Sequence, residues 1–315
     1  MSLHEAVKMR ARELGFLACG ITHPGPTEHA RQLEQWLANG YAGTMRYLNR
    51  QAERRKDPRK IAPNARAVVV VLDNYYNPDT EADTHPPRIA KYARGKDYHQ
   101  VTQRRLGELA GFLRKNGAEL SRTFADAGPV PERELAQRAG LGWIGKNTML
   151  IRPEAGSFFF IGSIFTDLLL ELDTPFETDR CGSCTRCLDA CPTDALLGPR
   201  LLDANRCISY LTIEQKGPIP SELADSFEGY AFGCDICNDV CPWNERFARP
   251  TNVPEFEPST DLTGTGPDFF EAMTSEEFTD RFGDTPLERA GLDGMRRNYR
   301  AAFRSAAPRT RAAVE

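Results

Sequence analysis

The sequence predicts an α/β domain followed by a smaller module that folds around bound metal. Helical patterns alternate with short apolar strands over about the first 170 residues. Eight of the nine cysteines then lie between Cys181 and Cys241. We therefore expect a first domain over residues 1–175, a cysteine module over 176–250, and a linker with a short helical region over 251–315.

Hydrophobic patterns predict the elements of the first domain. In chain order they indicate a helix over 3–14, a strand over 16–22, a helix over 28–37 and a long helix over 98–115 that ends near Gly117. Residues 67–72, AVVVVL, form a continuous apolar run. Such a run is typical of a strand covered on both faces. Two further helical patterns, over 268–282 and 294–305, follow a segment rich in Pro, Thr and Gly at 251–267.

Charge and hydropathy restrict the function. The net charge is −4, so bulk charge does not indicate a nucleic-acid binder. Residues 46–60 nevertheless hold seven Arg or Lys against two acids, and residues 281–315 hold eight Arg against four acids. The simplest interpretation of each segment is a solvated helix face. Because no apolar run approaches the roughly 18 residues of a membrane span and the N-terminus lacks a signal pattern, we expect a cytoplasmic protein without membrane contact.

The cysteines form two runs with iron–sulfur spacing. The runs are Cys181-x2-Cys184-x2-Cys187-x3-Cys191-Pro192 and Cys234-x2-Cys237-x3-Cys241-Pro242, with Cys207 between them. In bacterial ferredoxins the last cysteine of such a run binds the other cluster. The spacing therefore predicts two 4Fe-4S clusters in a ferredoxin-like module. Cluster 1 is assigned to Cys181, Cys184, Cys187 and Cys241, and cluster 2 to Cys191, Cys207, Cys234 and Cys237.

A pair of zinc sites is the alternative, but zinc favours separated C-x2-C pairs over a fourfold run that ends in Cys-Pro. Cys19 stands apart and is expected to be an ordinary buried thiol. A bare electron carrier does not need some 170 additional residues, so we expect the first domain to hold a redox acceptor that the clusters feed.

A glycine-rich segment, GLGWIG at 140–145, matches the dinucleotide pattern G-x-G-x-x-G. It follows a helical pattern over 132–139, whereas the dinucleotide motif must follow a strand and open a helix. We therefore reject NAD binding. The loop still allows close approach to a ligand, and Gly145, Lys146 and Asn147 are candidates to contact a phosphate or amide. A simple helix-ending turn is the alternative.

Asp126 precedes a Gly-Pro turn, which fixes the position of its carboxylate. This makes it a candidate general acid, with a turn-capping role as the alternative. We find no pair of histidines at ligand spacing, so no zinc or non-haem iron site is expected.

Five phrases together carry a family resemblance. They are KYARGKDYH (91–99), DAGPVPER (126–133), AGLGWIGKN (139–147), RCISYLTIE (206–214) and GCDICNDVCPWN (233–244). With the eight cysteines they resemble epoxyqueuosine reductase over about residues 5–305. The resemblance implies a nitroreductase-like cobalamin-binding domain, a fold shared with reductive dehalogenases.

The resemblance also implies a reaction. Members of the family reduce epoxyqueuosine to queuosine at the wobble position of tRNA, and electrons pass through the two clusters to cobalamin. Asp126 matches the proton donor. Ser209, Asp235 and Arg55 fall where the family contacts cobalamin.

The implied partners are a tRNA anticodon loop and an external low-potential donor such as ferredoxin or flavodoxin, and we expect a monomer. Arg296, Arg297, Asn298 and Arg300 resemble the start of the family's C-terminal helical region. Longer members continue with more helical repeats, which affects the expected tRNA surface but not the active site. The competing interpretations are a corrinoid reductase that acts on a small molecule and a non-catalytic electron carrier.

Overall fold

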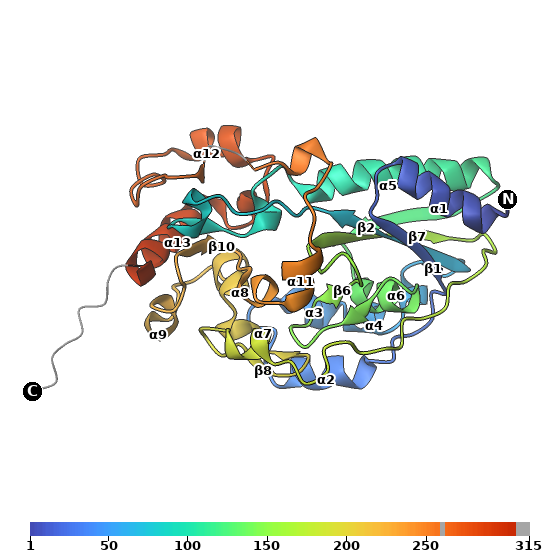
Figure 1. The fold of residues 1–315 in the computed structure, drawn as a ribbon, viewed down its shortest axis with the longest axis horizontal. Helices are drawn as coiled ribbons and strands as arrows, with labels where there is room; N and C mark the ends of the chain where they lie inside the picture. The colour runs from blue at the N-terminus through green and yellow to red at the C-terminus, as the bar shows by residue number, and fades with distance from the viewer. Residues whose placement is uncertain (259–261, 307–315) are drawn as a thin grey trace, which may run out of the picture.

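A four-stranded sheet lies at the centre of the first domain (Figure 1). The computed structural model describes residues 1–258 and 262–306. The strand order is β1 (Ala18–Thr22), β2 (Ala67–Asn74), β7 (Phe159–Thr166) and β4 (Ser121–Ala125). Each neighbouring pair is antiparallel. The expected mixture of helices and strands is confirmed, and the antiparallel pairing makes the domain an α+β one.

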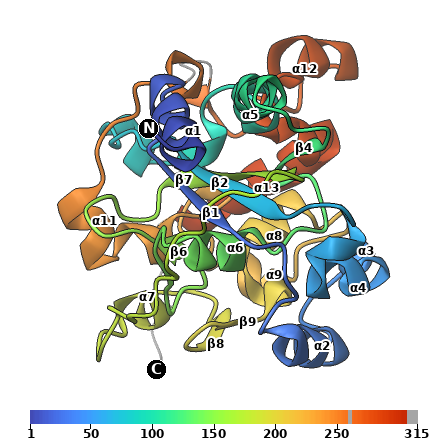
Figure 2. The same cartoon turned by 90° about the vertical axis from the view of Figure 1, so that its right-hand side faces the viewer.

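The central strand β2 is covered on both faces, as its apolar run predicts. Residues Ala67–Leu72 are fully buried. Val69 and Val71 pack with the residues of α1 (Leu3–Glu13) and α5 (Tyr98–Lys115). Val68 and Val70 pack with α6 (Glu132–Arg138) on the opposite face. Figure 2 shows α1 and α5 on one side of the sheet and α6 on the other.

Three helices near the N-terminus extend the first domain toward the cysteine module. They are α2 (Ala30–Ala38), α3 (Arg46–Arg50) and α4 (Ala52–Lys56). The Trp36 indole N–H donates to the carbonyl of Leu202 at 2.6 Å, and the Tyr210 hydroxyl accepts the N–H of Thr44 at 2.7 Å. These bonds join the first domain to the segment that carries Cys207.

The cysteine module consists of short elements. They are α7 (Arg186–Asp189), β8 (Leu196–Gly198), β9 (Leu201–Leu202), α8 (Ile208–Ile213), α9 (Ser221–Ala224), β10 (Tyr230–Phe232), α10 (Ile236–Asp239) and α11 (Pro242–Phe247). Strand β10 pairs in parallel with β3 (Arg88–Ile89) of the first domain. Directly after β3, the N–H of Ala90 donates to the carbonyl of Phe232 at 2.8 Å. The two regions therefore share a small sheet.

The C-terminal helices are α12 (Ser275–Phe282) and α13 (Gly291–Ala306). Helix α12 begins with a capping box between Thr274 and Glu277. This box explains why the helix starts later than the predicted residue 268. Phe270 and Tyr299 pack with Phe232 in one apolar cluster, which attaches this region to the cysteine module.

The segment expected to be a linker packs against the first domain. Phe256, in a 3-10 turn at Pro254–Phe256, lies in an apolar cluster with Tyr98 and Phe160. Residues 259–261, and the arginines of the basic segment at 309 and 311, lie outside the described residues.

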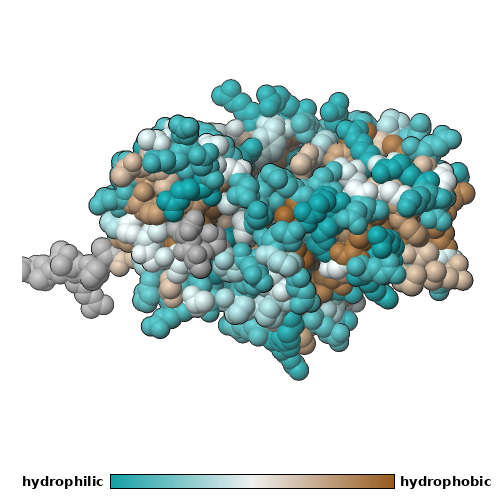
Figure 3. Space-filling model, turned by 90° about the horizontal axis from the view of Figure 1, so that it is seen from above, coloured by the Kyte–Doolittle hydropathy of each residue, from teal (hydrophilic) through white to brown (hydrophobic). Residues whose placement is uncertain are grey.

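The surface is polar on the face that Figure 3 shows, where hydrophobic residues form only small separate patches. Within residues 1–258 and 262–306, no helix is both long and apolar enough to cross a membrane.

Candidate functional site

Four cysteines surround one cavity. Cys181, Cys184, Cys187 and Cys241 line a space of about 230 Å³, together with Pro242. Among the described residues, no group of three or more His, Cys, Asp or Glu side chains is arranged to hold a single metal ion. Thiols set around a cavity suit a cube, whose four irons each bind a separate thiolate. These are the four cysteines that the spacing assigns to cluster 1.

The remaining four cysteines of the module form a second group. Burial raises the pKa of Cys234, and the neighbouring Cys237 and Cys207 raise it further. Burial likewise raises the pKa of Cys237, with Cys207 and Cys191 among the nearby charges. Cys187 of the first group is also among the charges that act on Cys237, so the assignment of four cysteines to cluster 2 stays a prediction. Cys19 lies apart in β1, where burial raises the pKa of its thiol to about 12.

Groups from the first domain donate to the cysteine loops. The Trp143 indole N–H lies 3.4 Å from the sulfur of Cys181. Lys146 donates to the carbonyls of Gly182 and Cys184 at 2.7 and 2.9 Å. Asn147 donates to the side-chain oxygen of Asn238 at 3.1 Å. The structure therefore directs these donors of the glycine-rich segment at the cluster loops.

The glycine-rich segment follows α6 and enters a β-hairpin of β5 (Trp143–Ile144) and β6 (Leu150–Ile151). This is not the strand-to-helix context of a dinucleotide motif. A Cβ at Gly142 would lie 2.2 Å from the carbonyl oxygen of Ile151, so glycine is required by the close approach of the two strands. The N–H of Gly145 donates to the carbonyl of Met149 at 2.8 Å and closes the hairpin.

Asp126 lies at the end of β4 with an exposed side chain and a backbone φ of 53°. Its backbone N–H donates to Oε1 of Glu132 at 2.8 Å. Its Oδ2 accepts the hydroxyl of Tyr98 at 2.5 Å. Burial, followed by the charge of Asp126, raises the pKa of Glu132 to about 8. The side chains of Asp126, Glu132 and Tyr98 therefore lie close together, and we call them the acid site.

Packed aromatic side chains extend from the acid site toward the cysteine module. The Tyr98 ring stacks on Phe160 with centroids 4.0 Å apart, and Tyr92 meets Tyr98 edge-on at 5.9 Å. Burial raises the pKa of Tyr92, and the carboxylates of Asp126 and Asp235 raise it further. Tyr92 therefore lies within electrostatic reach of both the acid site and the loop of cluster 2.

Arg55 is the predicted cofactor contact that lies nearest to Asp126 in its interactions. Arg55, in α4, is half-buried, and its Nε has no hydrogen-bond partner among the described residues. Burial lowers the pKa of Arg55, against the opposing charges of Tyr47, Glu132 and Asp126. Arg55 and Asp126 thus lie in one site.

Ser209 and Asp235 lie on the cluster side. Ser209 is half-exposed in α8, two residues after Cys207. Asp235 is only 2% exposed, and its Oδ2 accepts the backbone N–H of Lys91 at 2.7 Å. Their contacts with a cofactor stay predictions.

Sequence reasoning missed Glu132, Tyr98 and Tyr92, although all three stand in the phrases that carry the family resemblance. Glu132 carried a usable signal, because an acid in the first turn of a predicted helix shortly after Asp126 can reach back to the turn. The two tyrosines gave no signal without the tertiary contacts.

These groups define a two-cluster iron–sulfur protein that also carries an acid site. A family model described as "4Fe-4S double cluster binding domain" matches residues 180–244. A second, "Epoxyqueuosine reductase QueG, DUF1730", matches residues 55–127. The epoxyqueuosine reductase of Leadbetterella byssophila is 47% identical over 294 residues, which cover 93% of this chain and 95% of that protein. The chain belongs to the epoxyqueuosine reductase family, and it is an oxidoreductase.

Other relatives confirm the resemblance. The epoxyqueuosine reductase of Pseudomonas aeruginosa is 41% identical over 302 residues, 94% of this chain and 83% of that protein. An epoxyqueuosine reductase solved with an epoxyqueuosine-modified tRNA-Tyr stem loop has a TM-score of 0.85 and 30% identity, over 96% of this chain and 81% of that one. The Bacillus subtilis enzyme, with its catalytic aspartate loop swung out of the active site, has a TM-score of 0.84 and 31% identity over the same shares.

Proposed function

We propose that this protein reduces epoxyqueuosine to queuosine at the wobble position of tRNA, with electrons that pass through two 4Fe-4S clusters to cobalamin and with Asp126 as proton donor. The observation that carries the proposal is the exposed side chain of Asp126, whose carboxyl accepts the Tyr98 hydroxyl while its backbone N–H donates to Glu132. The eight cysteines are proposed as ligands in the two groups described above. The nitroreductase-like description of the first domain belongs to the same proposal.

Conversion of an epoxide to an alkene consumes two electrons and two protons and releases water. The departing oxygen needs a proton, because an alkoxide is a poor leaving group. Asp126 supplies that proton from the carboxyl oxygen that Tyr98 does not occupy, and solvent supplies the second. A substrate that covers the site excludes bulk water from this proton transfer.

Two polar side chains support cobalamin as the cofactor. The buried Nε of Arg55 lacks a partner among the described residues and offers a hydrogen bond to an amide oxygen. Ser209, beside the cluster ligand Cys207, offers a second polar group. When bound, cobalamin supplies a low-valent metal centre that delivers the two electrons.

The order of electron transfer follows from exposure. The loop of cluster 1 is exposed at Gly182 and Ser183, whereas Gly233 and Asp235 of the cluster 2 loop are buried. An external low-potential donor such as ferredoxin or flavodoxin therefore reaches cluster 1 first. Cluster 2, near Tyr92, passes the electron inward.

Arg46, Arg50 and Arg54 supply positive charge for the tRNA backbone. All three are exposed on α3 and α4, and they form no ion pair within the described part of the chain. Arg55 of the same segment lies at the acid site. An anticodon loop bound along these helices would therefore have its phosphates at the arginines and a splayed-out base near Asp126. We further propose that the chain acts as a monomer in the cytoplasm, where its tRNA substrate is.

The test uses anaerobic protein reconstituted with iron, sulfide and cobalamin, reduced with dithionite or a viologen, and supplied with tRNA that carries epoxyqueuosine. The tRNA is digested and its nucleosides are weighed by mass spectrometry. A cobalamin-dependent loss of one oxygen, which gives queuosine, is the expected result. An unchanged nucleoside, from protein that holds both clusters and cobalamin, would refute the assignment and favour a small-molecule substrate.

A further inference from the structure

A buried lysine connects the first domain to the loop of cluster 2. Lys91 begins a 3-10 turn, Lys91–Ala93, which Ala90 separates from β3. Its side chain is 3% exposed, although lysine is rarely buried unless it is paired. Its Nζ donates to Asp79 at 2.8 Å and to Asp239 at 2.9 Å. It also lies over the Phe158 ring, 5.5 Å from the centroid.

The contacts of Lys91 reach both ends of the loop that carries Cys234 and Cys237. Asp235 follows Cys234, and its carboxylate accepts the backbone N–H of Lys91 at 2.7 Å. Asp239 lies two residues after Cys237 and pairs with the ammonium. One residue of the first domain therefore holds two proposed cluster ligands in place through their neighbours.

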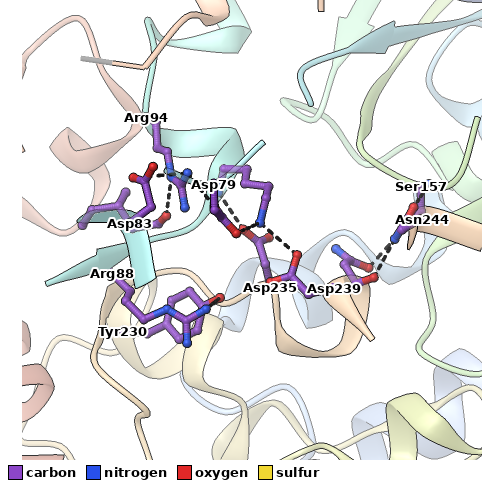
Figure 4. Close-up of polar contacts among 12 residues, drawn as sticks. Asp79, Asp83, Arg88, Arg94, Ser157, Tyr230, Asp235, Asp239 and Asn244 are labelled. Carbon is purple, nitrogen blue, oxygen red and sulfur yellow. Dashed lines mark hydrogen bonds and ion pairs between the residues drawn. The ribbon is translucent and has the colours of Figure 1, made fainter. Parts of the chain in front are cut away.

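The local charge balance makes Lys91 more than a structural contact. Arg94 pairs with Asp79 at 2.8 Å and with Asp83 at 3.3 Å. Figure 4 shows Arg94 and Asp83 on one side of Asp79, with Asp235 and Asp239 on the other. Lys91 is the only cation paired with Asp239 in the described part of the chain. Without it, Asp239 would have no ion-pair partner among the described residues, and the buried Asp235 would lose one of the two cations that face it.

The lysine is charged in this environment. Burial lowers the pKa of Lys91, but the carboxylates of Asp235 and Asp239 outweigh burial and raise it above its ordinary value. A cluster gains one negative charge when it is reduced. A fixed cation nearby favours that state, because charges interact strongly where water is excluded.

We propose that Lys91 positions the Cys234–Cys237 loop and raises the reduction potential of the cluster that this loop binds. The inference needs only the two clusters and is independent of the action on tRNA. Lys91 thereby sets the reduction potential of the cluster from which electrons reach the acceptor.

The test is a redox titration of the anaerobic, cluster-loaded protein, followed by electron paramagnetic resonance. In Lys91→Met the reduced-to-oxidised ratio of one cluster at fixed potential should fall by about tenfold, equivalent to about 59 mV for one electron. The reduction potential of the other cluster should not change. Lys91→Arg, which retains the charge, should restore the potential in part. Lys96→Met is the matched control, because Lys96 is 63% exposed and pairs only with Asp284 among the described residues.

Two further variants keep the inference falsifiable if Lys91→Met does not load its clusters. Asp239→Asn removes a facing negative charge and should raise the same potential. Cys237→Ser should change the paramagnetic resonance signal of the cluster whose potential shifts in Lys91→Met. That change identifies the shifted cluster as cluster 2. Unchanged potentials in a fully loaded Lys91→Met protein, an equal shift in Lys96→Met, or a lower potential in Asp239→Asn would each overturn the proposal.

Discussion

Replacement of Asp126 by Asn removes the acidic proton but preserves the geometry of the acid site. Asn tolerates the left-handed backbone at φ 53° nearly as well as Asp. Its side-chain oxygen can still accept the hydroxyl of Tyr98, and its backbone N–H can still donate to Glu132. The loop should therefore keep its conformation, and only the transferable proton is lost.

The size of the effect follows from that loss. A positioned general acid contributes about 10²–10⁴-fold to a rate. This corresponds to about 2.7–5.5 kcal/mol of transition-state stabilisation. We expect the single-turnover rate of epoxide reduction in Asp126→Asn to fall within this range, with unchanged iron, sulfide and cobalamin content.

Single-turnover rates would be measured with excess enzyme, pre-reduced clusters and modified tRNA, and quenched samples would be analysed for queuosine. Asp293→Asn is the matched control, because Asp293 is 97% exposed and pairs only with Arg296 among the described residues. If Asp126→Asn kept the wild-type rate, the general-acid role would be wrong and solvent would have to protonate the leaving oxygen.

Three further predictions address the clusters, the carboxyl group of Glu132 and the basic helices. Cys241→Ser should lose the iron of cluster 1, whereas Cys19→Ser should lose none, as measured by iron and sulfide per chain; equal loss in both would contradict the assignment. Glu132 holds its proton more tightly in the folded state, so stability should fall as pH rises from its unfolded pKa of about 4.3 to its folded pKa of about 8, by at most about 1.4 kcal/mol per pH unit. Urea unfolding of Glu132→Gln across this range should show a shallower slope than wild type, and parallel slopes would exclude a neutral Glu132 in the folded protein. Combined Arg50→Ala and Arg54→Ala changes should weaken binding of the tRNA stem loop and reduce the slope of log affinity against log salt by about one for each phosphate that is no longer neutralised; an unchanged slope would place the phosphates elsewhere.

Strongly periodic segments were predictable because their signals are local. The helix over 98–115 has the predicted bounds, with Asp97 accepting the N–H of His99 at its start and Asn116 as its C-cap. The valine run over 67–72 is fully buried, as its composition indicates. The 4Fe-4S double cluster module was also predictable from the cysteine spacing, because short loops between ligands restrict which thiols can meet.

Long-range features were not predictable from these patterns. Strand β3 has two residues and therefore no periodicity, and its partner β10 lies far along the chain. The burial of Lys91 depends on the carboxylates of Asp79 and Asp239, and Asp239 lies 148 residues further along the chain. The orientation of Glu132 toward Asp126 required a turn geometry with a positive φ, which a sequence pattern does not specify.

The pairing of β3 with β10 has a consequence for biogenesis. A ribosome releases residues 88 and 89 long before residues 230 to 232, so the earlier strand waits without its neighbour. The later strand ends two residues before Cys234, which is a proposed cluster ligand. Pairing of the two strands and insertion of iron and sulfide therefore involve neighbouring residues. We expect nascent chains in iron-starved cells to remain open at this junction and to be degraded, and pulse-chase turnover with and without an iron chelator would measure this.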